Sequence, residues 1–503
     1  MTFTFIALLW FTIQVAQTSQ LAIRDPEIDW ASIVSSHGDH FPDFSYSGYN
    51  NSDTSLPTIN HHDIVLSLPR KVTDDIAPAI QEAIDTVWEN GGGVVRLPPG
   101  KLYITAGMQL RSSVVVTGTG DRGTTLILKR RPSKAVFTLG RLGVAPKADF
   151  GFRSKIADAY VPIGASTVTV INGTGFAVGQ HIYVSRAVTE SWIRANGMSD
   201  LVRNGDPQQW IPVGKQIMAP NTIKAINGNK ITLKIPLADN LDLAYMRAEV
   251  RAYTPPELTS EMGIENLRIE VRDTCSGTPL DNTTCNYAAV KFASWTVDSW
   301  ASGLTLTGFN KFFEIQRDAS RITIQDSTMD RNKDIDGSAL PSDIMIRGSQ
   351  VLIQDCDQVG LDSARSFSVL TDSLTPGPNT VTRYTTESSV QTLEPHERWS
   401  WGLLVEESSA ITKFKNRGNM GTGHGWTMNA GVGWNLPNDV DFSSPPLGVN
   451  WCVGCGRQNE PRGNATFIQS GHQVRPRSLF AAQLKARGVQ WYHRREDKNG
   501  SDQ

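Results

Sequence analysis

The sequence predicts an all-β protein: a parallel β-helix with a capping helix near its N-terminus and a small antiparallel β insertion. Three observations support this prediction. One amphipathic helical pattern ends at the glycines 91–93 and is followed by short apolar runs with tight turns between them. Hairpin signals gather in residues 155–255. Five later segments align with one another, as the coils of a solenoid do when each buries its inner face against its neighbours.

The overall composition is that of a large globular protein. The chain has 503 residues, of which 39% are apolar and 19% are charged. Its formal charge of −2 gives no reason to expect a nucleic acid as partner. We expect six segments along the chain: a signal peptide (1–20), an extended arm (21–60), the first coils with the capping helix (61–154), the β insertion (155–255), the main coils (256–440), and a C-terminal cap and tail (441–503).

The N-terminal segment predicts secretion. Residues 1–16 are an apolar run of signal-peptide length, too short for a membrane span, and cleavage is expected between Ala16 and Ala22. No later run reaches transmembrane length, so we expect an extracellular protein that leaves the membrane once the signal is cleaved. Sequons for N-glycosylation fit this route and begin at Asn50, Asn172, Asn282, Asn464 and Asn499.

The five cysteines fit an oxidising compartment. A Cys275–Cys285 disulfide would close a surface loop, and Cys452 would bridge either Cys455 or Cys356. The odd count leaves at least one thiol unpaired. The spacing of Cys452 and Cys455 also occurs in redox and zinc motifs, but there is no second cysteine pair and no βαβ pattern near it.

The capping helix begins at Asp74 and Asp75, whose carboxylates suit the N-terminus of a helix. Its apolar residues recur at helical spacing: Ile76, Ile80, Ala83, Ile84, Val87 and Trp88. Short strands and the turn at 98–100 follow the glycines that end it. This pattern resembles the opening of the secreted pectate-lyase-like superfamily (pectin lyase fold). The resemblance implies a right-handed parallel β-helix in which the helix covers one end of the solenoid.

The insertion is predicted from strand-like runs at 167–170, 179–184, 223–226 and 231–235, with Asn-Gly turns at 172–173 and 227–228. A polar loop that contains tryptophans connects its two halves. This loop covers a cleft, binds sugar, or is simply an ordered surface loop. Its notable residues are Trp192, Arg194, Arg203, Trp210 and Lys215.

The main coils are predicted from segments 263–269, 302–306, 320–327, 349–356 and 409–416, which align with one another. Apolar residues alternate into the core, so that Ile322 superposes on Val351 and Ile324 on Ile353. A polar residue then closes each turn: Asp326 and Asp355 fall at the same place, and Asn416 lies one position past it. Residues 479–484 predict a short helix over the C-terminal end.

The candidate active surface is the stretch 394–399 together with 416–426, where histidine, arginine and tryptophan concentrate. In β-elimination a base removes the proton α to a uronic carboxyl group while a cation neutralises the carboxylate. The candidate catalytic residues are His396 or His424 as the base, with Arg398 and Arg417 as the cations. The candidate substrate-binding residues are Trp399, Trp426, Asp362 and Arg365.

Two alternatives stay open. A glycoside hydrolase would use carboxylates from the region of Asp355, Asp357 and Asp362. Gly423-His424-Gly425 resembles the Gly-His-Gly of polygalacturonases, but their Asn-Thr-Asp and Arg-Ile-Lys motifs are absent. The other alternative is a non-catalytic carbohydrate-binding or wall-associated protein. We expect a monomer whose partner is a polysaccharide, and no obligatory metal or other cofactor, because no carboxylate cluster has the spacing of a calcium site.

Overall fold

The computed structural model describes residues 25–59, 63–67, 71, 74–120, 123–129, 135–271, 287–332, 341–363 and 365–492. The predicted signal peptide, the sequons at Asn282 and Asn499, and the cysteines Cys275 and Cys285 lie outside these residues. Among the helices of the described part, none has the length and apolar character needed to cross a bilayer.

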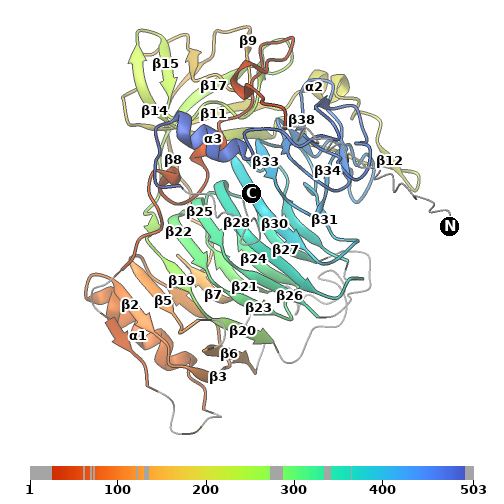
Figure 1. Cartoon of the computed structure of the whole chain (residues 1–503). Helices are drawn as coiled ribbons and strands as arrows, with labels where there is room; N and C mark the ends of the chain where they lie inside the picture. The colour runs from red at the N-terminus through yellow and green to blue at the C-terminus, as the bar shows by residue number, and fades with distance from the viewer. Residues whose placement is uncertain are drawn as a thin grey trace, which may run out of the picture.

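The body of the molecule is a parallel β-helix, as the sequence predicted (Figure 1). The described residues form one sheet of 18 strands and one of nine, and the strands within each sheet pair in parallel. Ile322 pairs with Val351 and Ile324 with Ile353, which is the predicted register between two coils. Stacked apolar side chains between the sheets form the main core, in which these four residues are fully buried.

The strands of the larger parallel sheet are β1 (Asp63–Val65), β2 (Gly93–Arg96), β3 (Gly100–Ile104), β5 (Val114–Thr117), β6 (Thr124–Leu128), β18 (Thr259–Ser260), β19 (Gly263–Glu265), β20 (Arg268–Val271), β22 (Thr296–Ser302), β23 (Thr305–Thr307), β25 (Ser320–Gln325), β26 (Thr328–Arg331), β28 (Ser349–Gly360), β30 (Asn379–Thr386), β33 (Leu403–Glu406), β36 (Val432–Trp434), β38 (Trp451–Val453) and β39 (Thr466–Ile468). The strands of the smaller parallel sheet are β4 (Met108–Leu110), β7 (Ala135–Leu139), β21 (Ala288–Phe292), β24 (Lys311–Ile315), β27 (Ser342–Ile346), β29 (Phe367–Thr371), β31 (Thr392–Leu393), β34 (Ile411–Phe414) and β37 (Val440–Phe442).

The polar residues predicted to close the turns have a conformational reason. The predicted Asp326 and Asp355 have φ values of 51° and 52°, in the left-handed region that Asn and Asp tolerate better than most other residues. Asn266, which was not predicted, has the same conformation with a φ of 55°, whereas the predicted Asn416 is not among the residues with positive φ. The alignment of 409–416 with these coils was wrong, because β34 belongs to the smaller sheet and pairs with β31 and β37. Strands of both sheets turn alternate apolar side chains into the same core, so the alternation alone does not distinguish them.

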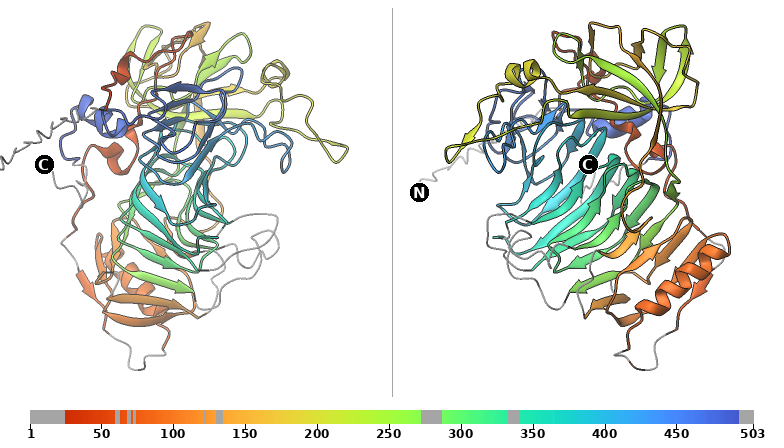
Figure 2. Two further views of the ribbon diagram at one scale, coloured as in Figure 1. Left: turned by 45° about the vertical axis from the view of Figure 1, so that its right-hand side comes forward. Right: turned by 180° about the vertical axis from the view of Figure 1, so that it is seen from behind.

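The capping helix α1 (Ala77–Glu89) covers the end of the stack that carries the earliest coils (Figure 2). It begins just after the predicted aspartates, and Asp75 Oδ1 accepts the N–H of Ala77 at 3.1 Å. Ile80 and Ile84 are fully buried against the first coils. The helix thereby shields the apolar end of the solenoid from water, as the resemblance implied.

The insertion is a six-stranded antiparallel sheet in the order β10-β15-β14-β11-β17-β8, with its own apolar core. It begins with β8, earlier in the chain than predicted. It lies against the side of the solenoid near the later coils, at the top of Figure 1. Its strands are β8 (Asp149–Lys155), β10 (Thr167–Thr169), β11 (His181–Ala187), β14 (Gln216–Asn227), β15 (Lys230–Leu233) and β17 (Ala248–Thr254). The smaller elements are α2 (Glu190–Ala195) and the pairs β9 (Tyr160–Val161) with β16 (Leu241–Asp242), β12 (Val202–Arg203) with β13 (Asp206–Pro207), and β32 (Ser400–Trp401) with β35 (Met428–Asn429).

One buried carboxylate joins the insertion to the solenoid. Asp239 pairs with Arg186 of β11, and both side chains are almost fully buried. From the solenoid, Trp399 Nε1 donates to Asp239 Oδ2 at 3.2 Å and Asn429 Nδ2 donates to Asp239 Oδ1 at 2.7 Å. Because a buried charge is tolerated only when it is paired and hydrogen-bonded, this network fixes the insertion on the coils.

The arm and the C-terminal helix α3 (Leu479–Ala486) hold each other on the outside of the larger sheet. The arm contains three short 3-10 helices, Trp30–Ser32, Phe44–Tyr46 and Tyr49–Ser52. The Phe44 N–H donates to Gln483 Oε1 at 2.9 Å, and Gln483 Nε2 donates to the Pro42 carbonyl at 2.9 Å. The predicted helix at 479–484 is therefore present, and the predicted arm is a packed segment with buried aromatic side chains.

A disulfide joins Cys452 to Cys455, at the end of β38 and the turn after it. Cys356 is a free thiol that is completely buried in the main core, where burial raises its pKa. Of the predicted sequons in the described residues, Asn172 and Asn464 are exposed and Asn50 is partly exposed.

The carboxylate of Glu406 should be essential for the attachment of α3. Glu406 is fully buried and accepts the N–H groups of Leu479 at 2.8 Å and Phe480 at 3.2 Å, and the hydroxyl of Ser478 at 2.6 Å. Glu406→Ala leaves these donors without an acceptor, which should cost about 3 kcal/mol of unfolding free energy. Denaturant unfolding followed by tryptophan fluorescence measures the loss. The exposed Glu82→Ala is the matched control, and equal stability of the two variants would contradict the assignment.

Candidate functional site

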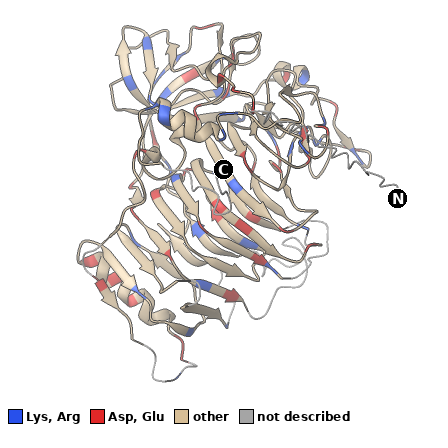
Figure 3. Cartoon of the chain, viewed as in Figure 1, with Lys and Arg blue, Asp and Glu red and all other residues tan. Residues whose placement is uncertain are grey.

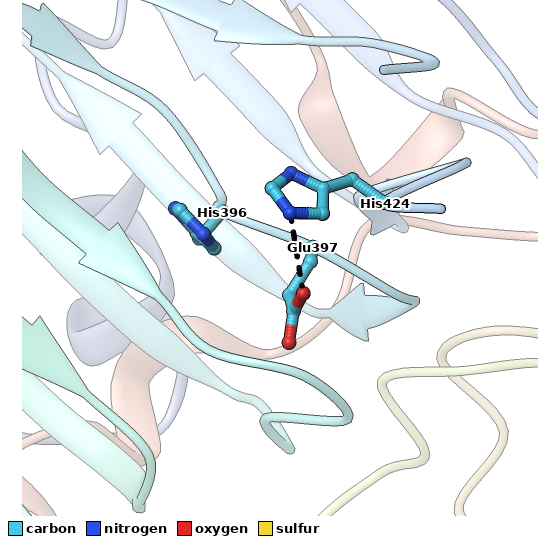
Figure 4. Close-up of side chains that lie close together, drawn as sticks. All are labelled: His396, Glu397 and His424. Atoms are coloured by element: carbon cyan, nitrogen blue, oxygen red, sulfur yellow. Dashed lines mark ion pairs between the residues drawn. The ribbon is translucent and has the colours of Figure 1, made fainter. Parts of the chain in front are cut away.

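The predicted active stretch does come together in space. His396, Glu397 and Arg398 follow β31, and His424 lies in the glycine-rich loop between β34 and β35. The Arg398 N–H donates to the His424 carbonyl at 3.0 Å, and the His396 N–H donates to the Thr371 carbonyl at 2.8 Å. Figure 4 shows the two imidazole rings and the Glu397 carboxylate close together. The two halves of the stretch are therefore neighbours, as predicted from sequence.

Both imidazole rings of this cluster are neutral at pH 7. Their centroids are 4.7 Å apart, and His424 Nε2 lies 3.5 Å from Glu397 Oε2. Burial, and then the charge of Arg417, lowers the pKa of His396 to about 4. Burial, and then the neighbouring His396 and Arg417, lowers the pKa of His424 to about 3. Burial also raises the pKa of Glu397, against the opposing effect of Arg398.

The two arginines of the cluster bind groups of the chain itself. Arg398 pairs with Glu397, and its Nε donates to the Trp210 carbonyl at 2.6 Å. Arg417 Nη1 donates to the His396 carbonyl at 2.7 Å, and its Nε lies 3.3 Å from Glu394 Oε1. A substrate carboxylate would have to displace these acceptors. The catalytic roles of His396, Arg398, Arg417 and His424 stay predictions.

The prediction that Trp399 binds sugar was wrong, because its side chain is buried. It is 1% exposed and packs edge-on against Trp192 and Trp210, which stack on each other with centroids 4.8 Å apart. The loop tryptophans of the insertion are therefore almost fully buried at an interface with the solenoid, and Trp210 also borders a surface pocket of about 340 Å³. Trp426 is half-buried, and its Nε1 donates to the Asn196 carbonyl at 2.9 Å.

Asp362 and Arg365 are exposed and lie before β29, at the end of that strand opposite to Thr371. Asp362 Oδ1 accepts the N–H of Ser389 at 3.0 Å. Within the described ranges, no hydrogen bond or ion pair connects either residue to the histidine cluster. Their assignment to substrate binding stays a prediction.

A larger cleft lies between the insertion and the solenoid, with a volume of about 580 Å³. One wall comes from β11, β14 and β17 of the insertion, and the other from β22, β25 and β28 of the larger parallel sheet. The four predicted catalytic residues are not among its lining residues. A concave site at the junction of two substructures is a common place for a ligand.

Aromatic side chains form part of the cleft wall. Tyr183 and Tyr253 stack with centroids 4.3 Å apart, and Trp295 lies 6.3 Å from Tyr253. The Trp295 Nε1 donates to the Pro146 carbonyl at 2.9 Å, which fixes the indole in place. The Trp295 ring is largely buried and still lines the cleft.

Basic side chains outnumber acidic ones in the lining of the cleft. Five basic residues line it (Lys215, Lys234, Arg317, Arg321 and Arg347) against one acidic residue, Asp318. Over the strands that face the viewer in Figure 3 the two signs are interspersed, so this excess is local. Arg321 pairs with Asp298 at 2.7 Å and Arg347 with Glu314 at 3.1 Å. Lys215 and Lys234 are exposed and make no ion pair within the described part of the chain.

His181 is the histidine of this cleft. It opens β11 and its ring lies 5.7 Å from that of Tyr253. Burial lowers its pKa below 6.5, and the charges of Arg321 and Lys234 lower it further, so the ring is neutral at pH 7. Burial raises the pKa of Asp318, whose Oδ1 lies 3.5 Å from the Tyr183 hydroxyl. The sequence analysis did not identify His181 as a site residue. The available signal was its spacing from Tyr183, because residues two apart in a strand lie on the same face.

A second, smaller groove of about 300 Å³ contains the carboxylates of Asp326 and Asp355 on adjacent coils. Arg383 binds Asp355 in a bidentate manner, with both N–O distances at 2.7 Å. Arg383 Nη1 also donates to the Tyr492 hydroxyl at 3.3 Å. Asp355 is thus part of an ion pair, in addition to closing its turn.

Comparison with known proteins gives limited information. No protein-family model matches the sequence, and no curated protein matches it. Among solved structures, the chain is similar to a tailspike protein of E. coli bacteriophage HK620 in complex with a pentasaccharide (12% identity, 78% of this chain and 54% of that chain covered, TM-score 0.36). A tailspike of Acinetobacter baumannii bacteriophage AP22 in complex with a capsular saccharide matches at 9% identity, covering 79% of this chain and 67% of that chain, with a TM-score of 0.28. The chain spans about half the length of the HK620 protein. At these values the matches carry no information about the ligand or reaction of this chain.

Proposed function

We propose that this protein is a secreted enzyme that binds a uronic-acid-containing polysaccharide in the cleft between the insertion and the solenoid and cleaves it by β-elimination. One observation carries the proposal. The cleft places a neutral imidazole, His181, beside Lys234, whose ammonium group makes no ion pair with any described residue, and among further basic side chains. A base and a cation at one place are what β-elimination from a uronate requires.

Each step of the elimination is assigned to residues of the cleft. Lys234 binds the uronate carboxylate and neutralises the charge that develops when the α proton leaves. Arg321 is already paired with Asp298 and adds positive charge beside it. His181 takes that proton, the electron pair forms a carbon–carbon double bond, and the bond to the glycosidic oxygen breaks. Asp318, whose pKa is raised by burial, is the acid that protonates the leaving oxygen. The aromatic rings of Tyr253 and Trp295 provide apolar surface for the sugar rings.

Glycoside hydrolysis is the second candidate. It needs two carboxyl groups that flank the scissile bond, and the cleft lining contains only Asp318. The smaller groove does contain two, Asp326 and Asp355, which favours this alternative to a limited extent. The ion pair between Asp355 and Arg383 opposes it, because a carboxylate held by a guanidinium is a weaker base or nucleophile.

A panel of acidic and neutral polysaccharides tests the reaction. We expect products with the ultraviolet absorbance of unsaturated uronates from at least one acidic polysaccharide, and none from neutral ones. New reducing ends without that absorbance would indicate the hydrolase instead. Retention on an acidic polysaccharide matrix without any product would indicate a binding protein.

Removal of the Lys234 ammonium group should weaken substrate binding. Lys234 is exposed, so the expected cost of Lys234→Ala is ~1 kcal/mol, or about a fivefold increase in KM at low ionic strength. Added salt should diminish the difference, because exposed charges are screened. Lys224→Ala is the matched control, since Lys224 is an exposed lysine of the same sheet outside the cleft. Equal KM values for the two variants would exclude Lys234 from the binding site.

The pH dependence of kcat/KM should report His181. A general base is active when deprotonated, so activity is lost as the pH falls through its pKa. Burial and the facing charges of Arg321 and Lys234 lower that pKa below 6.5. The acidic limb of the profile should therefore have its midpoint below 6.5. A midpoint above this value would mean that another group is the base.

Secretion is part of the proposal. It is supported by the apolar run at residues 1–16 and by the Cys452–Cys455 disulfide, because disulfides persist mainly in oxidising compartments. We further propose that the enzyme acts as a monomer. Light scattering of the purified protein measures its mass directly, and a dimer or trimer would contradict that part.

A further inference from the structure

The cluster of His396, Glu397 and His424 has a geometry that the proposed elimination in the cleft does not use. Each of the three residues offers one ligand atom, and these atoms all lie within 4.8 Å of one another. Figure 4 shows the imidazole rings and the carboxylate as neighbours, although His424 comes from a different loop. Such an arrangement requires the two loops to be held in fixed positions.

Main-chain hydrogen bonds fix the loops. The His424 N–H donates to the Met420 carbonyl at 3.0 Å, and the Gly425 N–H donates to the Gly418 carbonyl at 2.9 Å, so the glycine-rich loop is closed on itself. A Cβ atom at position 421 would lie only 1.9 Å from His424 Nε2, so any residue other than glycine would clash with the His424 ring. The glycine therefore leaves the space that the His424 ring occupies.

Two buried ring nitrogens lack a partner. In the described structure, neither His396 Nδ1 nor His424 Nδ1 has a hydrogen-bond partner, and both atoms are inaccessible to solvent. His424 as a whole is only 8% exposed. A buried polar atom without a partner is costly. A metal on His424 Nε2 would leave His424 Nδ1 still without a partner, so it is the spacing of the ligand atoms that points to a metal.

We propose that His396, Glu397 and His424 are the protein ligands of a divalent transition metal site, for which Zn²⁺ is the best match. Two imidazole nitrogens and one carboxylate oxygen are ligands that Zn²⁺ takes at about 2.0–2.2 Å. Ligand atoms on a tetrahedron of that size lie roughly 3.3 Å apart. The 3.5 Å between His424 Nε2 and Glu397 Oε2 matches this spacing. The three ligand atoms lie within 4.8 Å of one another, so a bound metal would require His396 to come closer.

Other cations fit less well. Ca²⁺ and Mg²⁺ prefer oxygen ligands throughout, and two of the three ligands here are nitrogens. Arg417 pairs with Glu394, outside the three ligands. Arg398 pairs with Glu397 Oε2, the same oxygen that faces His424, so a metal would have to replace Arg398 at that oxygen. Arg398 keeps its bonds to the Trp210 carbonyl and to Thr422 when Glu397 turns to the metal.

The site would join the glycine-rich loop to the coil that carries His396. The same loop contacts the insertion, since Arg203 Nη1 donates to the Gly421 carbonyl at 2.6 Å and Asn419 Nδ2 donates to the Val202 carbonyl at 2.6 Å. A bound metal would therefore stabilise the contact between the insertion and the solenoid at a place away from the cleft. This role does not depend on the proposed elimination.

Metal titration of the intact, untagged protein tests the site. After chelator treatment and dialysis, we expect one equivalent of Co²⁺ to bind and to give a visible ligand-field band, which Zn²⁺ removes by displacement. Zn²⁺ should also raise the temperature of thermal unfolding. His424→Ala and Glu397→Gln should each lower the affinity for Co²⁺ by about 100-fold or more, because even the loss of a group that only orients a ligand costs about 10–100-fold.

His472→Ala is the matched control, because His472 is exposed and far in sequence from the cluster. It should bind Co²⁺ as the unaltered protein does. Glu397→Gln keeps the shape of the side chain, so it decides the question if His424→Ala fails to fold. No stoichiometric Co²⁺ binding by the unaltered protein, or equal affinity in Glu397→Gln, would overturn the proposal.

Discussion

Replacement of His181 by alanine is expected to lower kcat for eliminative cleavage by about 10²–10⁴-fold, the usual contribution of a general base. The imidazole is neutral at pH 7 and lies in the cleft with Lys234 and Arg321, so no other ionisable group of the lining is as well suited to take the proton. Burial raises the pKa of both Tyr183 and Tyr253, and that of Tyr253 is about 12, which makes their phenolates unavailable. Product absorbance at saturating substrate measures kcat.

Two controls distinguish a catalytic role of His181 from a structural one. The affinity of His181→Ala for an uncleaved acidic oligosaccharide should stay within about twofold of the original, because the cations of the cleft remain. His472→Ala should have full activity, since His472 is an exposed histidine outside the cleft. A His181→Ala variant with full kcat would exclude His181 as the base.

Asp239→Ala should cause the largest loss of stability. The change leaves Arg186 buried without its counter-charge and removes the acceptor of Trp399 and Asn429. Loss of one partner of a buried ion pair costs about 3–5 kcal/mol. Because the same carboxylate holds the insertion on the solenoid, we also expect the affinity for acidic oligosaccharides to fall. Denaturant unfolding and oligosaccharide titration measure the two effects.

Asp239→Asn separates charge from hydrogen bonding at this position. It keeps an acceptor and should lose less stability than Asp239→Ala. The exposed Asp200→Ala is the control for removal of an aspartate from the insertion and should be close to neutral. If Asp239→Ala loses less than about 1 kcal/mol, the buried network does not hold the insertion as described.

The fold could be predicted from sequence because its signals are local. The helical pattern that follows Asp75 and the alternation of Ile322 and Ile324 each occupy a few consecutive residues. The register between Ile324 and Ile353 also followed, since one coil repeats the pattern of the next. The alternation does not indicate to which of the two sheets a strand belongs. For this reason β34 was aligned with strands of the larger sheet, whereas it belongs to the smaller one.

The cleft could not be predicted because its residues meet only through tertiary structure. His181 and Lys234 belong to the insertion, whereas Trp295 and Arg321 belong to solenoid coils. Their approach depends on how the insertion lies on the coils, which Asp239 determines from a loop without any recognisable motif. The concentration of histidine and arginine at 394–399 and 416–426 was conspicuous in sequence, and it marks the cluster for which we propose a metal.

The most direct test of eliminative cleavage with His181 as the base compares the unaltered protein with His181→Ala on a panel of polyuronates, with ultraviolet absorbance of the products and new reducing ends recorded together. We expect both signals to rise in parallel for the unaltered protein on at least one polyuronate, and both to fall by about 100-fold or more in His181→Ala. Reducing ends that form without ultraviolet absorbance, or full absorbance from His181→Ala, would contradict this mechanism.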